Sequence, residues 1–271
     1  METTYDKQSE PDYKERSCNW KTAIGLQQVD GLVPTKYLVE LANQNINGEL
    51  SIEEVRLKIQ NYYDNKSVKT DDEKREKEAD LVSQRIAELL SLNAFTLSTV
   101  QLIAIHKYLF ESIYDFAGKI RNFNISKKEY ILEDASVEYG NSAIIAEMLE
   151  HNIQKEKKFN YQPLDKQKII EHFAEFISDL WQIYPFAEGN TRTTAVFVIK
   201  YLRSFGYNIG NETFGKHSWY FRNALVRANY QNAERNIFKT NVPLIKFLKN
   251  LLLNEQNELK NRELHINATA N

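Results

Sequence analysis

The sequence is poor in the residues that cross-link chains or interrupt helices. Its 271 residues include one cysteine, five prolines and nine glycines. A lone cysteine, Cys18, excludes an internal disulfide and a thiolate metal cluster, and it indicates a reducing, cytoplasmic location. The scarcity of proline and glycine favours a mostly helical protein, because both residues destabilise helix interiors.

A long apolar run and a strong net charge are also missing. The most apolar stretch, residues 193–205, is interrupted by Lys200 and Arg203, whereas a membrane span requires roughly 18 to 20 apolar residues. Residues 1–15 are polar and do not resemble a signal peptide. Lys and Arg number 35 against 37 Asp and Glu, a formal net charge of -2. We therefore expect a soluble protein that binds neither membranes nor nucleic acid.

Composition and periodicity divide the chain into five segments. They are a mobile arm (1–18), a small helical module (19–63), a charged linker (64–80), a helical domain (81–253) and a polar tail (254–271). Within the module, Ser51 and Glu54 have the spacing of a capping box. The charged segment has no apolar face, so it is interpreted as a linker or as a solvated helix start. We expect the module to lean on the domain, because so few residues bury little surface alone.

One stretch of the domain breaks the helical pattern. In residues 121–132, Phe123 and Ile125 alternate with polar residues, a polar turn follows, and three apolar residues end the stretch. This pattern predicts a short β-hairpin that rests on the helices, since two strands alone are marginally stable.

Two consecutive helices and the loop between them carry the main chemical signal. Apolar residues recur at helical spacing up to Tyr184, where Pro185 ends the first helix. A tight loop, residues 186–190, follows, and Asn190 is the expected N-cap of a second helix over residues 191–205. That helix is apolar on nearly all sides, which predicts a central, buried position.

The loop places polar groups at the amino end of a buried helix, a position that favours an anion such as phosphate. Arg192 adds a bidentate cation, and Glu188 is suited to Mg²⁺ bound together with substrate phosphates. Gly189 lets the backbone approach a ligand closely. The alternative is ordinary turn chemistry, because Pro, Gly and Asn are common between helices without any ligand.

Residues 184–192 read Tyr-Pro-Phe-Ala-Glu-Gly-Asn-Thr-Arg. This segment resembles the signature loop of the Fic (Fido) family, His-Pro-Phe-x-Asp/Glu-Gly-Asn-Gly-Arg-x-x-Arg. Residues 105–121 resemble the early helix of that family and its exit into a flap, and residues 219–230 resemble the helix that closes its nucleotide pocket. The likeness covers roughly residues 81–253.

The resemblance implies an all-α Fic domain with a β-hairpin flap, which binds ATP and Mg²⁺ and transfers AMP to a hydroxyl group of a target protein. The implied site residues are Glu188 for the metal; Phe186, Gly189, Asn190, Thr191 and Arg192 for the nucleotide; and Asn124, Ile125, Ser126 and Lys127 of the flap for the target protein. The alternative is an inactive member that binds nucleotide or protein. Formation of a homo-oligomer is left open.

Three departures from the family motif weaken the implied chemistry. The catalytic His is Tyr184, whose phenol has an ordinary pKa near 10 and would need it lowered by roughly 3 units to act as a base at pH 7. Tyr184 is therefore either the catalytic residue of a slow reaction or the end of an apolar stripe. Thr191 replaces a Gly where phosphates approach, and Ala195 replaces the final Arg.

Residues 26–31 resemble the small antitoxin of Fic toxin systems, in which a Ser-x-x-x-Glu-Gly pattern carries an inhibitory Glu. Here Leu26 stands for the Ser, Asp30 for the Glu, and Ala195 for the Arg that pairs with that Glu. We therefore favour a module that stabilises the fold, with Asp30 as a regulatory candidate if it reaches the pocket. His106 lies among apolar residues and is predicted to be a core residue.

Overall fold

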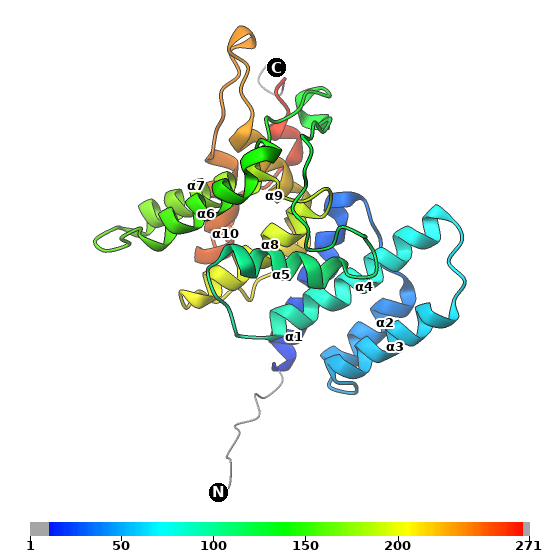
Figure 1. Ribbon diagram of the computed structural model, residues 1–271. Helices are drawn as coiled ribbons and strands as arrows, with labels where there is room; N and C mark the ends of the chain where they lie inside the picture. Colours follow the sequence, from blue (N-terminus) through cyan, green and yellow to red (C-terminus); the bar gives the residue numbers. More distant parts are fainter. Residues whose placement is uncertain (1–10, 268–271) are drawn as a thin grey trace, which may run out of the picture.

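The computed structural model (Figure 1) describes residues 11–267, and this part of the chain forms ten α-helices and no β-strand. The all-helical prediction is confirmed. The helices are α1 (Tyr13–Leu26), α2 (Lys36–Ile46), α3 (Ile52–Asn65), α4 (Asp71–Ser91), α5 (Thr99–Phe110), α6 (Ile145–Lys157), α7 (Lys166–Ile183), α8 (Asn190–Ser204), α9 (Thr213–Asn229) and α10 (Val242–Leu253).

Helix α8 lies at the centre of the molecule, as its apolar sequence predicts. Every residue from 190 to 202 is buried, and the helix contacts α4, α5 and α7. A helix that is apolar all round is stable only when neighbours cover every side. The start of α8 is therefore fixed by three surrounding helices, which makes it a rigid base for a site.

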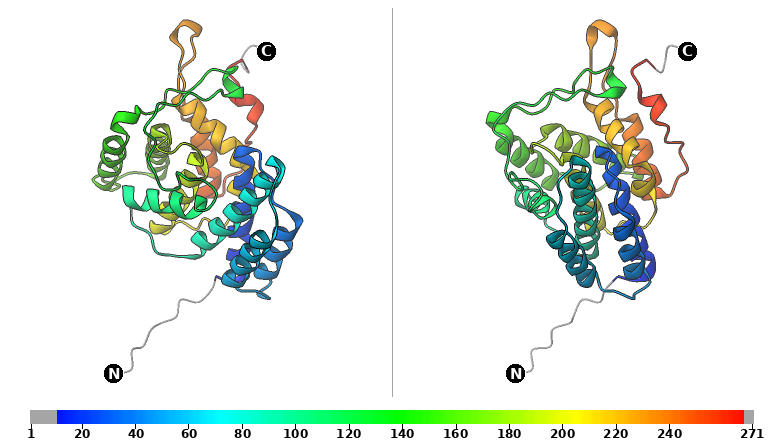
Figure 2. Two further views of the ribbon diagram at one scale, coloured as in Figure 1. Left: turned by 45° about the vertical axis from the view of Figure 1, so that its right-hand side comes forward. Right: turned by 90° about the vertical axis from the view of Figure 1, so that its right-hand side faces the viewer.

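The N-terminal helices share the core of the domain. Helix α1 packs against α4 and α9, and Trp20 and Leu38 belong to the same hydrophobic cluster as Phe197 and Phe221. Figure 2 shows these N-terminal helices, blue to cyan, along one side of the other helices. The module thus leans on the domain, as expected from its size.

The segment predicted as a charged linker or a solvated helix start is largely helical, which fits the second of these interpretations. Helix α4 begins at Asp71, and Thr70 and Glu73 form a capping box at its start. Asp80 is buried in this helix and accepts hydrogen bonds from the Thr35 and Tyr63 hydroxyls at 2.6 and 2.8 Å. The charged side chains of the first turns face solvent, and the capping box sets the start of the helix. Because Asp80 is buried and bonded to α3 and to Thr35, residues 71–80 belong to the folded domain.

Two further boundaries differ from the prediction. Helix α1 begins at Tyr13, within the segment expected to be a mobile arm, and Asp12 caps it; residues 1–10 of that arm lie outside the described residues. The polar tail folds back, because Leu264 is buried and the Ile266 N–H donates to the Ile131 carbonyl oxygen at 3.0 Å. A few apolar residues in a polar tail thus suffice to hold it on the core.

The predicted β-hairpin is wrong. Within residues 11–267, the one isolated β-bridge joins Asn232 and Ile237, and residues 121–132 are irregular apart from a 3₁₀ turn at Tyr130–Leu132. The buried Arg121 guanidinium donates to the carbonyl oxygens of Tyr184 and Gly140, at 2.7 and 2.5 Å. We expected the backbone of this segment to pair with a second strand, because apolar and polar residues alternate in it. The Arg121 side chain instead bonds the segment to the loop after α7.

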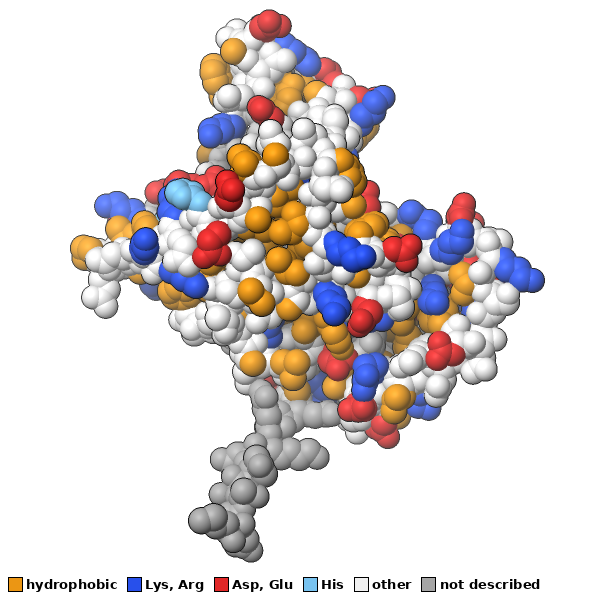
Figure 3. All heavy atoms as spheres, viewed as in Figure 1, with side chains coloured by type: hydrophobic (Ala, Val, Ile, Leu, Met, Phe, Trp, Pro, Cys, Tyr) orange, Lys and Arg blue, Asp and Glu red, His pale blue; other side chains and the backbone are white. Residues whose placement is uncertain are grey.

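Charged side chains of both signs are interspersed over the face of the molecule drawn in Figure 3. Among residues 11–267, no helix has both the length and the apolar character that a membrane span requires. A loop between α9 and α10 projects beyond the helices in Figures 1 and 2.

Candidate functional site

The loop between α7 and α8 is a sharp turn made of left-handed residues. Tyr184, the C-cap of α7, has φ 50°, and Gly189, the N-cap of α8, has φ 78°. A Cβ at position 189 would lie 2.4 Å from the ring of Phe110. Gly189 is therefore required by both backbone angle and space. Asn190, predicted as the N-cap, is instead the first residue of the helix.

Asn190 closes this loop with its side chain. Its Oδ1 accepts from the Phe186 N–H at 2.9 Å, and its Nδ2 donates to the Phe186 carbonyl oxygen at 2.7 Å. All of these groups are buried, so each bond also satisfies a backbone group that water cannot reach. Asn190 therefore fixes the shape of the loop before α8, and the first N–H groups of this helix have no partner within the helix.

His106 on α5 contacts the loop through a hydrogen bond and a stacked ring. Its Nδ1 accepts from the Gly118 N–H at 2.9 Å, so its Nε2, 3.0 Å from the Glu188 carbonyl oxygen, is the donor. The ring stacks on Phe186 with centroids 3.7 Å apart. Burial lowers the pKa of His106 to about 4, so the ring is neutral at pH 7. The predicted core position is confirmed, and His106 also positions the loop.

A cavity of about 620 Å³ opens in front of this loop. It is bordered by side chains from five parts of the chain that are distant in sequence: Asp30, Glu78, Lys127, Glu188 with Arg192, and Trp219. A volume of this size accommodates a small-molecule ligand. The predicted closing helix, α9, contributes Trp219 and Arg222, and the Arg222 guanidinium lies 5.3 Å from the centroid of the Trp219 ring.

Arg192 is held by three partners from the N-terminal part of the chain. Its Nη1 donates to Gln27 Oε1 at 3.0 Å and its Nη2 to Glu78 Oε1 at 2.6 Å. Its Nε lies 2.8 Å from Asp30 Oδ2, an ion pair in which the N–H is not aligned for a hydrogen bond. Arg192 is fully buried over the Phe110 ring, 4.8 Å from its centroid.

The buried charge of Arg192 is stabilised by these carboxylates. Burial by itself lowers the pKa of a guanidinium, but Asp30 and Glu78 together outweigh burial and raise the pKa of Arg192 above its ordinary value. A buried charge that lost both partners would be strongly destabilising. Arg192 is therefore held between the carboxylates of Asp30 and Glu78, and we call this pair of carboxylates the clamp.

The sequence did not predict the clamp. In the family that the chain resembles, the Glu at the position of Asp30 pairs with an Arg at position 195, where this chain has the buried, uncharged Ala195. Asp30 instead pairs with Arg192, one turn earlier on α8. The view that the module only stabilises the fold is therefore incomplete, since Asp30 reaches the cavity. Glu78 was missed because it lies in the predicted linker; the Thr70–Glu73 capping box was the signal for that helix.

Glu188 points into the cavity and remains accessible. Its side chain is 53% exposed, and Oε2 lies 3.7 Å from Lys127 Nζ. Within residues 11–267, no three His, Cys, Asp or Glu side chains are grouped closely enough to form a metal site. A single accessible carboxylate nevertheless suits Mg²⁺, which is commonly bound by one or two carboxylates together with substrate phosphates.

Tyr184 is not among the residues that border the cavity, and its position does not suit a general base. Its side chain is 3% exposed and packs on the Tyr139 ring, with centroids 4.3 Å apart. Burial is the main influence on this phenol and raises its pKa above the ordinary value, despite the nearby cations Lys127 and Arg222. The hydroxyl is therefore protonated at pH 7 and is unsuited to accept a proton.

The remaining predicted residues have separate positions. The Thr191 hydroxyl accepts from Trp181 Nε1 at 3.0 Å, so this side chain faces α7 and not an approaching phosphate as expected. Asn124 Oδ1 accepts from the Ser142 N–H at 2.8 Å, and Ser126 is exposed. Ile125 is half-buried and packs on the core.

Of the four predicted flap residues, Lys127 alone borders the cavity. Its backbone N–H donates to Ser136 Oγ at 3.0 Å. A second pair, Arg222 and Glu129, was not predicted. These side chains form a bidentate, buried ion pair at 2.6 and 2.9 Å in the wall of the cavity. Its partners are 93 residues apart, so no local pattern reveals it.

Comparison with known proteins relates the middle of the chain to one family. Residues 96–202 match the Fic/DOC family, a segment that includes the whole loop and most of α8. Protein adenylyltransferase VbhT of Bartonella schoenbuchensis is 29% identical over 105 residues, which cover 39% of this chain and 21% of that protein. Probable protein adenylyltransferase Fic of Escherichia coli is 22% identical over 146 residues, covering 51% of this chain and 70% of that protein.

A third relative, probable protein adenylyltransferase y4lH of Sinorhizobium fredii, is 28% identical over 109 residues, 39% of this chain and 53% of that protein. The chain thus spans between a fifth and about half of VbhT and y4lH. These similarities are low and partial.

Proposed function

We propose that this chain binds ATP with Mg²⁺ in the cavity at the start of α8 and transfers AMP slowly to a hydroxyl group of a target protein. The observation that carries the proposal is that Glu188 and Arg192, the latter in the first turn of α8, border one cavity, and that both lie within the segment that matches the Fic/DOC family. The relatives are named as protein adenylyltransferases, and this name supports the proposed reaction class.

The phosphates would bind at the amino end of α8. The unpaired N–H groups of a first helical turn and the positive end of the helix dipole favour an anion. Lys127 Nζ, 31% exposed at the cavity, supplies a positive charge. Burial tends to lower the pKa of Lys127, but Tyr184 and Glu188 raise it overall, so the ammonium is retained at pH 7.

Glu188 is the residue that would hold Mg²⁺, and the metal would neutralise charge on the phosphate oxygens when bound. The protein's own part is to keep this carboxylate at the cavity. The Glu188 carbonyl oxygen accepts from His106, while the Glu188 side chain is 53% exposed and lies 3.7 Å from Lys127 Nζ. The short loop between Phe186 and Asn190 thus fixes the backbone of the ligand residue.

In the transfer itself, a hydroxyl oxygen of the target attacks the α-phosphorus of ATP, pyrophosphate leaves with the electrons of the broken P–O bond, and the hydroxyl proton passes to solvent. The buried Tyr184 phenol, protonated at pH 7, does not take that proton. Loss of a general base costs about 10² to 10⁴ in rate, while positioning terms persist. We therefore expect slow transfer.

The clamp gives a second reason for low activity. Arg192 is engaged by Asp30 and Glu78, so a phosphate must compete with two carboxylates for the guanidinium. Release of these carboxylates would free a cation that fits phosphate in bidentate form. The N-terminal module is then a regulatory element that sets nucleotide affinity.

The second candidate function is nucleotide or protein binding without transfer. The observation in its favour is the burial of Tyr184, 3% exposed, at the position where the family motif has its base. In this case the cavity binds nucleotide, and no AMP is transferred.

One labelling experiment separates the two candidates. The natural chain, Tyr184→His and Glu188→Gln are incubated with ATP labelled at the α-phosphate, Mg²⁺ and candidate target proteins. Slow labelling by the natural chain, lost in Glu188→Gln and unaffected in the control Glu175→Gln, supports transfer; the side chain of Glu175 is 55% exposed and pairs with Lys155 outside the cavity. Labelling only by Tyr184→His supports the binding function. Absence of ATP binding in every form rejects both transfer and nucleotide binding.

A further inference from the structure

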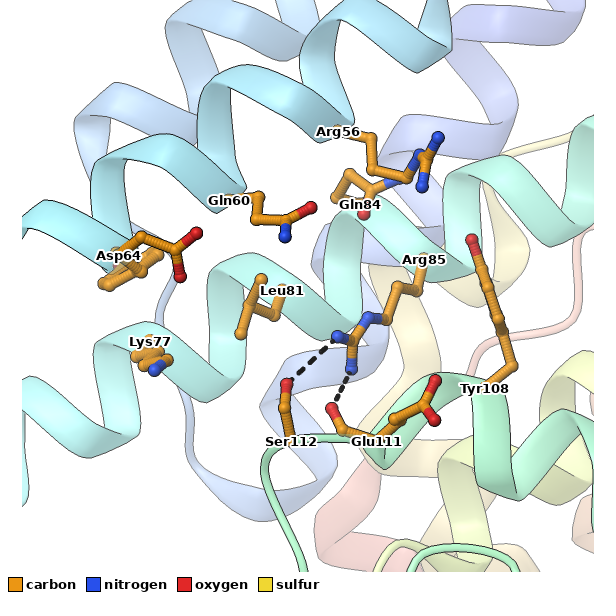
Figure 4. A pocket seen from close by; sticks show the side chains of 11 residues that line it. Arg56, Gln60, Asp64, Lys77, Leu81, Gln84, Arg85, Tyr108, Glu111 and Ser112 are labelled. Atoms are coloured by element: carbon orange, nitrogen blue, oxygen red, sulfur yellow. Dashed lines mark hydrogen bonds between the residues drawn. The ribbon is translucent and has the colours of Figure 1, made fainter.

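A second cavity lies between α3, α4 and the end of α5, apart from the site described above. Its volume is about 360 Å³, enough for a small organic molecule. Figure 4 shows Gln60, Leu81, Arg85 and Tyr108 around one space, with Arg56 and Lys77 on opposite sides. None of these residues borders the cavity at the start of α8.

Helical spacing explains why these side chains meet. On α4, Lys77, Leu81 and Arg85 are four residues apart, so they lie along one face. On α3, Arg56 and Gln60 have the same spacing. Helices α3 and α4 pack together and α4 also packs on α5. The two polar faces are therefore held opposite each other by the helix packing.

Arg85 is a cation with unused donors. Its Nη1 donates to the carbonyl oxygens of Leu109 and Glu111 at 3.0 and 2.7 Å, and its Nη2 to Ser112 Oγ at 3.4 Å. A guanidinium has five N–H groups. Within residues 11–267, the Arg85 Nε–H and one Nη2–H have no hydrogen-bond acceptor, and no carboxylate lies within ion-pair distance.

Two other cations of the cavity are also incompletely paired. The Nε of Arg56 is buried and has no hydrogen-bond partner within the described residues. Lys77 Nζ lies 5.9 Å from the centroid of the Tyr63 ring, and no carboxylate of residues 11–267 lies within ion-pair distance of it. Among the cations of this cavity, the Arg56 Nε is the buried atom that lacks a partner within the described residues, and the Nη2 of the same side chain pairs with Glu53 at 2.6 Å. Buried polar groups in folded proteins are nearly always bonded, so this exception requires a reason.

The acidic side chains of the cavity do not provide these partners. Asp64 and Glu111 border it, and both are exposed residues. Glu88 is nearby but accepts from Gln84 Nε2 at 2.6 Å. The cavity wall therefore combines three cations and two carboxylates, and the cations have donors to spare.

We propose that this cavity binds a small organic anion, a carboxylate or phosphate ester whose apolar body lies against Leu81, Tyr63 and Tyr108. The Nε–H and Nη2–H of Arg85 receive the anionic group, because the guanidinium fork matches carboxylate and phosphate oxygens. Lys77 adds charge from the opposite side. The proposal does not depend on the function of the first cavity.

Binding is tested with three probes that share one ring: benzoate, phenyl phosphate and the uncharged benzamide. The natural chain is titrated while the Nε–H resonance of Arg85 is followed by NMR, after assignment with Arg85→Lys. We expect saturable shifts with a Kd of about 1 mM or tighter for at least one anion, and no saturable shift with benzamide. The two anions distinguish a carboxylate site from a phosphate site.

Two variants locate the site without removing the Arg85 contacts to α5. Lys77→Met should weaken anion binding about tenfold, and Gln60→Trp should block it by filling the space. The matched control is Lys58→Met, which makes the same charge change on the exposed surface of α3 outside the cavity. Thermal unfolding of each variant checks that the fold is kept. Equal affinity in Lys77→Met and Lys58→Met, or no saturable shift with either anion at 20 mM, would overturn the proposal.

Discussion

The clamp on Arg192 leads to a quantitative prediction for Asp30→Asn. This substitution keeps the size of the side chain and removes the charge that lies 2.8 Å from Arg192 Nε. Glu78 and Gln27 remain bonded to the other two nitrogens. Arg192 thus keeps part of its pairing, and the fold is not left with an isolated buried charge.

The magnitude follows from the geometry. Two unit charges about 4 Å apart attract by about 4 kcal/mol at an effective dielectric constant of 20, and much of this is offset by the cost of removing both groups from water. We expect the free energy of unfolding to fall by about 1 to 2 kcal/mol. Because Arg192 then faces one competing carboxylate instead of two, the Kd for MgATP should fall about tenfold, equivalent to about 1.4 kcal/mol.

The assay pairs calorimetric titration of MgATP with urea unfolding of the same samples. Glu78→Gln should shift both quantities in the same directions, since its Oε1 can still accept from Arg192 and Tyr114. The control Asp179→Asn removes a carboxylate that lies 3.9 Å from Lys155 on the surface, and it should change neither quantity appreciably.

Two results would refute the reasoning in different ways. If stability falls in Asp30→Asn while the Kd for MgATP stays the same, Arg192 is released but does not meet the nucleotide. If neither the stability nor the Kd changes, the ion pair between Asp30 and Arg192 contributes no measurable free energy. A chain that binds no MgATP in any variant would instead reject the proposed function.

Three further predictions concern the loop before α8. Gly189→Ala should lower the free energy of unfolding by about 2 to 4 kcal/mol, because it adds a left-handed Ala and a contact with Phe110; Gly206→Ala, also left-handed but with nothing within 4 Å, should cost only about 1 kcal/mol in the same urea titration. Because the pKa of His106 is about 4 when folded and about 6.5 when unfolded, the unfolded chain binds the extra proton between these values, and stability should fall as the pH is lowered from 6.5 to 4. Its share of this loss approaches about 3 kcal/mol, and urea unfolding at pH 7 and pH 5 should show a smaller loss in His106→Gln. Tyr184→Phe should leave any labelling rate within about twofold of the natural chain, because the phenol stays protonated; a tenfold drop in single-turnover rate, with the fold intact by circular dichroism, would show that its hydroxyl takes part.

Local sequence signals located the main helices and the loop. The capping box at Ser51 and the break at Pro185 correctly placed the start of α3 and the end of α7, because caps and proline act through neighbouring backbone groups. The same kind of signal at Thr70 shows where α4 begins, although the charges that follow it predicted a linker. The alternation of apolar and polar residues in 121–132 wrongly predicted a β-hairpin. Exposed loops show the same pattern, and here the Arg121 side chain bonds the segment to the loop after α7.

The sequence by itself determined the helical class, the buried position of α8 and the polar residues at its start, because periodicity and turn chemistry are properties of neighbours along the chain. Only the tertiary structure decided which groups meet Arg192: Asp30 and Glu78 are 162 and 114 residues away from it in sequence. It also decided that Tyr184 is buried with a raised pKa and that three cations share a cavity with donors to spare. Contacts of this range depend on how whole helices pack, and no local pattern records them.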